Sequence, residues 1–241
     1  MLPKERIILA LDVERFQEAQ KLVLSFKDEV GMFKVGKQLF THCGPKIIDF
    51  IKMKDAKVFL DLKYHDIPNT VAKASVEAVK LGVDMLNLHA LGGLKMMEEA
   101  KNAVHNAAKE LGIKRPKILA VTVLTSVDQG VLEEMGLKIK VSELTQNLSV
   151  LAKKAGMDGV VAGGEDIEKV RKLCGEEFII VTPGIRIDEK IDDQKRVITP
   201  TEAILRGATY IVIGRTILTK DDPHAELRKI AKSIENALSY R

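Results

Sequence analysis

Short apolar runs alternate with amphipathic segments along the whole chain. Uniform apolar runs, typical of strands that are buried on both faces, are expected over 6–12, 32–36, 57–62, 85–89, 117–123, 159–163, 178–182 and 210–215. Between these runs apolar residues recur at helical spacing, and two of the segments stop at Gly31 and Gly82. The pattern therefore predicts repeated strand–helix units.

The amphipathic segments complete the predicted architecture. Helices are expected over 16–30, 38–53, 71–81, 94–111, 144–155, 166–173, 201–206 and 227–238, and the irregular stretch 126–140 has room for one short helix. Eight strand–helix units in 241 residues favour a single-domain α/β protein, a (β/α)8 TIM barrel over 1–241, because such barrels are typically about 250 residues long. A doubly wound open sheet is the alternative, and no linker or low-complexity tract divides the chain.

Polar residues gather at one end of the predicted strands. At or just beyond the carboxyl ends lie Asp12, Lys34, Asp61, Lys63, His89, Thr125, Arg186 and Arg215. Barrel enzymes build their active sites at this end. The stretch 58–70 is the densest, because it places Asp61, Lys63 and Asp66 within six residues just before a Pro68-Asn69-Thr70 helix start.

The charges of this stretch suggest chemistry. On an extended chain Asp61 and Lys63 point the same way, and nearby carboxylates keep a lysine protonated. A solvated ion pair at a barrel rim is the simpler alternative. A metal site built from Asp61, His65, Asp66 and His89 is another, but the Lys63 ammonium would compete for the same negative charge. Hydrogen-bonded structural roles suit the two histidines better.

Two glycine–arginine segments predict a phosphate site. Gly214-Arg215 lies at the end of the eighth predicted strand, and 182–186, which ends in Arg186, begins at the end of the seventh. This is the usual phosphate-binding corner of a barrel. Backbone N–H groups near glycine and an arginine fork both suit a dianion. Turn glycines beside exposed arginines are the alternative. The charged loop that continues to about residue 196 is a candidate lid.

Composition and charge exclude several partner classes. The net charge is +4, its 38 Lys and Arg are interspersed with 34 Asp and Glu, and aromatic residues make up only 4%. This predicts no nucleic-acid surface. No signal-peptide pattern is present, and no apolar run approaches the roughly 18 residues of a membrane helix, so the expected location is cytoplasmic with no membrane partner.

Several segments together resemble the orotidine 5′-phosphate decarboxylase family, most closely its bacterial branch. They are Ala10-Leu11-Asp12, Phe33-Lys34-Val35-Gly36, the stretch from Asp61 to Thr70, 181–186, Asp193-Gln194-Lys195-Arg196 and Ile213-Gly214-Arg215. The Asp-x-Lys-x-x-Asp element also occurs in related sugar-phosphate decarboxylases and synthases. The lysine at the end of strand two and the Asp-Gln-Lys-Arg segment make the resemblance specific, and no motif position departs from the family pattern.

The resemblance implies a reaction and its catalytic residues. The expected reaction converts orotidine 5′-monophosphate to UMP and carbon dioxide, the last step of de novo UMP biosynthesis, with neither cofactor nor metal. Lys63 would face C6, stabilise the developing carbanion and deliver the proton. Asp61 would lie against the departing carboxylate, and Lys34 and Asp66 would complete an alternating array of charges.

The resemblance also implies substrate contacts and a homodimer. Asp12 and Lys34 would bind ribose hydroxyls, Thr125 the pyrimidine edge, and Arg186, Gln194, Gly214 and Arg215 the phosphate. Asp66 and Thr70 would reach into the neighbouring subunit's site. A metal-dependent sugar-phosphate epimerase or decarboxylase and a non-catalytic phosphate-ligand sensor are the alternatives that sequence leaves open.

Overall fold

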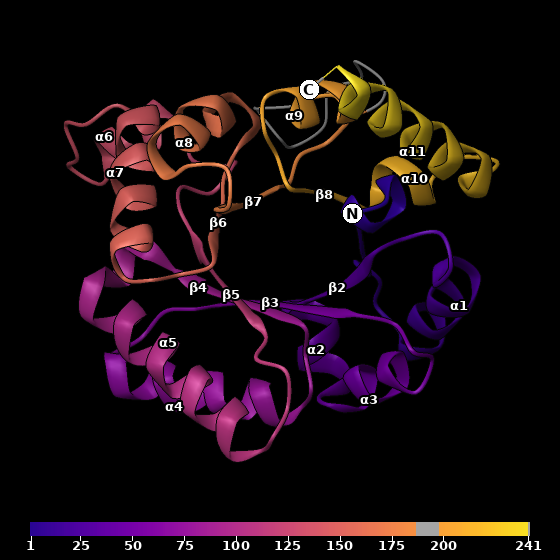
Figure 1. Ribbon diagram of the computed structural model, residues 1–241, viewed down its shortest axis with the longest axis horizontal. Helices are drawn as coiled ribbons and strands as arrows, with labels where there is room; N and C mark the ends of the chain where they lie inside the picture. Colours follow the sequence, from indigo (N-terminus) through magenta and orange to yellow (C-terminus); the bar gives the residue numbers. More distant parts are fainter. Residues whose placement is uncertain (187–197, 241) are drawn as a thin grey trace.

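A closed barrel of eight parallel strands forms the centre of the computed structural model, which describes residues 1–186 and 198–240 (Figure 1). The strands are β1 (Ile7–Ala10), β2 (Met32–Gly36), β3 (Val58–Tyr64), β4 (Met85–His89), β5 (Lys117–Val121), β6 (Gly159–Val161), β7 (Ile179–Thr182) and β8 (Tyr210–Ile213). They pair in sequence order, and Ile8 of β1 closes the barrel by pairing with Met32 on one side and Val212 on the other. The predicted TIM barrel is confirmed.

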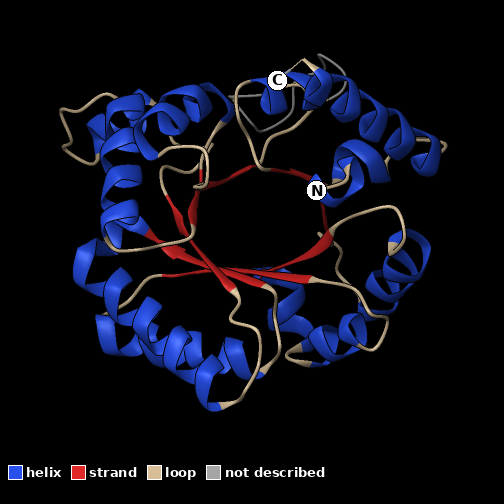
Figure 2. Cartoon of the chain, in the orientation of Figure 1, coloured by secondary structure: helices blue, strands red, loops and turns tan. Residues whose placement is uncertain are grey.

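Helices cover the outside of the barrel (Figure 2). They are α1 (Phe16–Phe26), α2 (Lys37–Cys43), α3 (Lys46–Lys52), α4 (Pro68–Lys80), α5 (Gly93–Glu110), α6 (Gln129–Glu134), α7 (Val141–Lys154), α8 (Ile167–Cys174), α9 (Pro200–Leu205), α10 (Arg215–Leu218) and α11 (Pro223–Ser239), with 3-10 turns at Pro3–Arg6, Ala90–Gly92 and Gly164–Asp166. Among the described residues, no helix is long and apolar enough to cross a membrane.

The strands are buried on both faces, which is why their sequences read as uniform apolar runs. Successive residues of β1 pack on opposite sides of the barrel wall. Ile8 packs inside the barrel, while Ile7 and Leu9 pack against the surrounding helices. Ile8, Met32, Phe59, Met85, Leu119 and Val181 fill the barrel interior. This packing fixes the strand ends as a rigid platform for side chains.

Most predicted elements differ from the structure by a few residues at their ends, and two of these differences change how an element ends. The helix expected over 38–53 is two helices, because Gly44 adopts φ +60° and Pro45 follows it, so the first helix ends there. The last strand, expected to continue to Arg215, ends at Ile213, because Gly214 is the N-cap of α10 and Arg215 is the first residue of that helix.

A β-bulge interrupts β3 at the end of the barrel that carries the polar residues. Leu60 pairs with Leu86 and Tyr64 pairs with Leu88, so four residue steps on β3 lie opposite two on β4. Within the bulge Lys63 has φ +52°, a left-handed conformation that is rare outside glycine. Bulges of this kind redirect side chains and are common beside active sites.

Candidate active site

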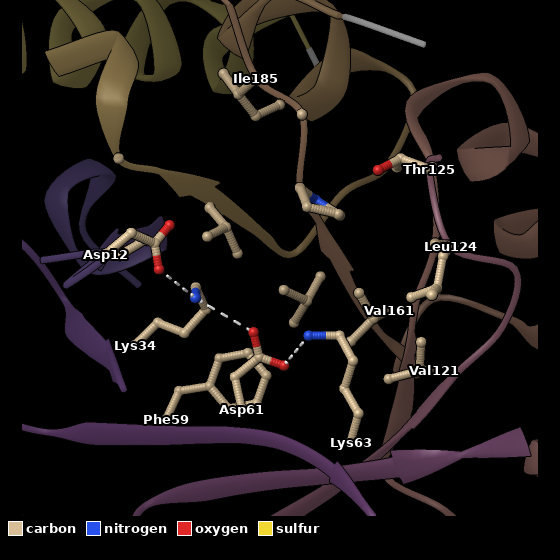
Figure 3. A pocket seen from close by; sticks show the side chains of 18 of the residues that line it. Asp12, Lys34, Phe59, Asp61, Lys63, Val121, Leu124, Thr125, Val161 and Ile185 are labelled. Atoms are coloured by element: carbon tan, nitrogen blue, oxygen red, sulfur yellow. Dashed lines mark hydrogen bonds and ion pairs between the residues drawn. The ribbon is translucent and has the colours of Figure 1, made fainter. Parts of the chain in front are cut away.

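A cavity of about 240 Å³ opens at the carboxyl ends of the strands. Residues at or after the ends of β1, β2, β3, β5, β6, β7 and β8 line it, so it lies on the barrel axis where the predicted site residues converge (Figure 3). Its walls include apolar side chains such as Phe59, Leu124 and Val161. A cavity with apolar walls and a few convergent charges is a typical small-molecule site.

Four charged side chains of alternating sign form one side of this cavity, and we call Asp12, Lys34, Asp61 and Lys63 the charge row (Figure 3). The Lys34 ammonium Nζ lies 3.1 Å from Asp12 Oδ1 and 3.3 Å from Asp61 Oδ2. The Lys63 Nζ lies 2.6 Å from Asp61 Oδ1. Asp61 therefore holds one ammonium on each of its two oxygens.

Lys34 and Asp61, at the centre of the charge row, are buried, and each shifts the pKa of the other. Lys34 and Asp61 are only 9% and 8% exposed. Burial alone would raise the pKa of Asp61, but the positive charges of Lys34 and Lys63 and hydrogen bonds from Lys63 and Asn87 bring that pKa below its ordinary value. Burial likewise opposes the charge of Lys34, yet Asp61 and Asp12 raise the Lys34 pKa. The pair is ionised throughout the neutral pH range.

Asn87 is a residue of this site that the sequence reasoning missed. It lies in β4, is fully buried, and donates from Nδ2 to Asp61 Oδ1 at 2.7 Å. Its Oδ1 accepts the backbone N–H of Lys63 at 2.8 Å. The available signal was a lone amide inside the apolar run Met85–His89, because a buried amide needs polar partners.

The predicted phosphate residues lie together on another part of the same cavity. Arg186, Gly214 and Arg215 all line it, and Arg186 Nη1 donates to Thr216 Oγ1 at 3.0 Å. Gly214 is packed so closely that a Cβ there would lie 3.2 Å from the Cβ of Ala10. Gln194 and the candidate lid of which it is part lie outside the described residues.

Thr125, which the family resemblance assigns to the pyrimidine edge, also lines the cavity. It follows β5, is half-buried, and stands on the wall opposite Asp12 and Lys34 (Figure 3). The cavity therefore has charges along one wall, a hydroxyl on another, and arginines at the edge formed after β7 and β8.

Asp66 and Thr70 are not part of this chain's own cavity. Both are exposed and neither is among the residues that line it. The Asp66 carboxylate accepts the backbone N–H of Ile67 at 2.6 Å. Of the predicted Lys-Asp-Lys-Asp array, the single chain brings together Lys34, Asp61 and Lys63, with Asp12 next to Lys34.

The two histidines near the charge row contact one another rather than the cavity. The rings of His65 and His89 are 5.3 Å apart, and neither residue lines the cavity. Burial, together with His65 and the nearby lysines, lowers the pKa of His89 to about 4, so it is neutral at neutral pH. Within residues 1–186 and 198–240, no three His, Cys, Asp or Glu side chains form a group that could hold a metal ion.

Comparisons with known proteins agree with the geometry. A family model described as "Orotidine 5'-phosphate decarboxylase / HUMPS family" matches residues 5–230. The chain is 51% identical to the orotidine 5'-phosphate decarboxylase of Pelobacter propionicus over 91% of each chain, and 48% identical to that of Geotalea daltonii over 96% of each. It is also similar to the crystal structure of the Lactobacillus acidophilus enzyme, with a TM-score of 0.83, 36% identity, and 95% and 98% of the two chains covered.

Proposed function

Because the chain belongs to the orotidine 5′-phosphate decarboxylase family and converts orotidine 5′-monophosphate to UMP in pyrimidine biosynthesis, we propose that its charge row performs the chemistry. The observation that carries this proposal is the buried Asp61 carboxylate, which holds the Lys63 ammonium at 2.6 Å and the Lys34 ammonium at 3.3 Å inside the cavity.

The reaction requires fixed positive charge beside one carbon atom. When the bond from C6 to the carboxylate breaks, carbon dioxide leaves and the electron pair stays on a vinylic carbon that the ring cannot delocalise well. A preorganised ammonium stabilises that pair at the moment it forms. Lys63 supplies this charge, and one of its N–H protons then moves to C6 to give UMP.

Asp61 and its neighbours organise this ammonium. The Asp61 carboxylate orients Lys63 and occupies the side where the substrate carboxylate departs, while Lys34 balances the other carboxylate oxygen. Because the row is held by ion pairs and hydrogen bonds before substrate arrives, it needs little rearrangement in the transition state.

The remaining cavity residues bind the parts of the substrate that do not react. Asp12 and Lys34 contact the ribose hydroxyls and Thr125 the pyrimidine edge. Arg186, Gly214 and Arg215 bind the phosphate, as their common position in the cavity supports. These contacts lie away from C6, and they lower its barrier to the extent that they are stronger in the transition state than in the bound substrate.

We also propose that the functional unit is a homodimer in which Asp66 and Thr70 act in the partner's site. Their exposure supports it, because in this chain both are open to solvent and neither lines its own cavity. Ile67, between them, is 66% exposed, which suits an interface that would cover it.

The role of Lys63 is tested by Lys63→Ala, with Lys95→Ala as a control because its side chain is 81% exposed on α5. Turnover of orotidine 5′-monophosphate is followed by ultraviolet absorbance in EDTA. Lys63→Ala should lose nearly all turnover while still binding UMP, and Lys95→Ala should match wild type. Substantial residual turnover in Lys63→Ala would refute the role. Loss of wild-type turnover in EDTA would favour a metal-dependent reaction.

The shared site is tested by mixing two inactive variants. Lys63→Ala and Asp66→Ala should each be nearly inactive, but a mixed dimer collects both defects in one site and neither in the other. Random exchange of equal amounts makes half of the dimers mixed, so about a quarter of wild-type activity should return. If subunit exchange is shown by mass and no activity returns, Asp66 does not act across an interface.

A further inference from the structure

Asn87 connects two parts of the catalytic apparatus through one side-chain amide. Its Nδ2 donates to Asp61 Oδ1 at 2.7 Å and its Oδ1 accepts the Lys63 backbone N–H at 2.8 Å. The orientation of the amide is not ambiguous, because a backbone N–H needs an acceptor and an ionised carboxylate needs a donor. The side chain is fully buried and does not line the cavity.

The bulge in β3 explains why an amide is needed at this place. The shift between the Leu60–Leu86 and Tyr64–Leu88 pairs displaces Lys63 from regular pairing with β4, and its N–H bonds to a side chain instead. Lys63 also adopts φ +52°, a left-handed conformation that a residue with a Cβ rarely takes. Such a conformation persists only where the surroundings hold it.

The same amide also acts on the Lys63 ammonium. Asp61 Oδ1 receives both Asn87 Nδ2 and Lys63 Nζ, the latter at 2.6 Å. Asn87 thus holds the backbone of the lysine at one end and the carboxylate that orients its ammonium at the other. We propose that Asn87 is the positioning residue for Lys63, acting through Asp61 and through the Lys63 backbone. This inference rests on the catalytic role proposed for Lys63.

The first test replaces the amide and compares it with a matched buried hydrogen bond. Asn87→Ala should lower kcat about 100-fold, the loss typical of a reacting group displaced by about 1 Å. KM should change little, because Asn87 does not touch the cavity. The control is Thr122→Val, which removes a buried donor to the Val161 carbonyl, 2.9 Å away, at the same end of the barrel. Its kcat should remain that of wild type.

A second variant keeps the shape and makes the hydrogen bonding depend on pH. In Asn87→Asp the protonated carboxyl can donate to the Asp61 carboxylate and accept from the Lys63 backbone N–H, as the amide does. The ionised carboxyl cannot donate, and it places a second negative charge against Asp61. Lys34 and Asp12 lie beyond Asp61, and His89, two residues after Asn87 on β4, contacts His65. These groups are present in both proteins. Dividing the variant kcat by the wild-type kcat therefore removes their effect on the pH profile and leaves the titration of the new carboxyl.

The outcomes separate this inference from the role of Lys63. The kcat ratio of Asn87→Asp to wild type should rise as pH falls from 8 to 5, because burial and the neighbouring Asp61 carboxylate raise the pKa of the new carboxyl from about 3.9 by roughly 1–4 units. A flat ratio, or an Asn87→Ala kcat equal to that of Thr122→Val, overturns the positioning role. If Asn87→Ala does not fold, the pH ratio alone decides. An active Lys63→Ala instead overturns the proposed function itself.

Discussion

Removing the central charge of the charge row should destabilise the protein far more than removing its outer charge. Asp61→Asn and Asp12→Asn make the same chemical change, and both carboxylates lie near the Lys34 Nζ, at 3.3 Å and 3.1 Å. They differ in exposure, since the Asp61 side chain is 10% exposed and that of Asp12 is 52%. Asp61 also pairs with Lys63, so the comparison measures what burial and the second ammonium add together.

The magnitude follows from the two ammonium groups that Asp61 holds. At about 4 Å between charge centres and an effective dielectric constant near 20, each attraction is about 4 kcal/mol before desolvation is subtracted. Breaking a buried pair by removing one partner costs about 3–5 kcal/mol, because the other charge stays buried. Asp12→Asn should cost about 0–1 kcal/mol, as exposed pairs do. For a domain of this size, Asp61→Asn should lower Tm by roughly 6–20 °C.

Urea unfolding at several pH values measures the effect and checks its cause. The pKa of Asp61 is lower in the folded protein, so its ionisation stabilises the fold above the unfolded value and this stabilisation is lost as pH falls through the folded value. The difference between wild type and Asp61→Asn should be constant from pH 5 to 8, about one unit or more above the ordinary Asp pKa, and should shrink below about pH 4. If Asp61→Asn is as stable as wild type or more stable, the row is instead strained for catalysis at the expense of stability.

Three further predictions concern other parts of the chain. Gly159→Ala should destabilise the barrel by about 1–3 kcal/mol in urea unfolding, because the added Cβ would overlap the Ile179 backbone carbonyl oxygen. Gly92→Ala should cost less, because the added Cβ meets only the Met96 side chain, which can move. Equal losses in the two variants would contradict this reasoning. The His89 ring should titrate by NMR near its pKa of about 4, and its contribution to stability should decrease as pH falls from 6.5 toward that value; a midpoint near 6.5 would contradict the burial argument. Arg215→Ala should raise KM for orotidine 5′-monophosphate and leave turnover of orotidine, which lacks phosphate, little changed; equal losses would mean that Arg215 does not bind phosphate.

The barrel was predictable because burial on both faces leaves a direct trace in the sequence. Apolar runs such as 32–36 and 85–89 coincide with β2 and β4, and the number of strand–helix units favoured a closed barrel over an open sheet, which the strand order confirms. The errors arose where one residue changes the backbone direction. Gly44 with its φ of +60° and Gly214, the N-cap of α10, end elements that apolar periodicity alone would continue.

The charge row was predictable for a related reason. A charge at the buried end of an apolar strand is costly unless it is paired, so charges at neighbouring strand ends pair with one another, as Lys34 of β2 and Asp61 of β3 do. The positions of Asp66 and Thr70 could not be tested in this way, because a single chain does not contain the surface that would cover them. Sequence resemblance and the exposure of both residues support their role.

The local geometry that places Lys63 could not be predicted from alternation. Period two correctly placed Asp61 and Lys63 on the same side, since both line the cavity, but the strand between them is not regular and Lys63 is left-handed. The two extra residues of the bulge leave a backbone N–H that only a side chain on the next strand can satisfy, and Asn87 supplies it. A polar residue that reads as an interruption of an apolar strand is thus required by an irregularity in its neighbour, and the two can be recognised only when the register between them is known.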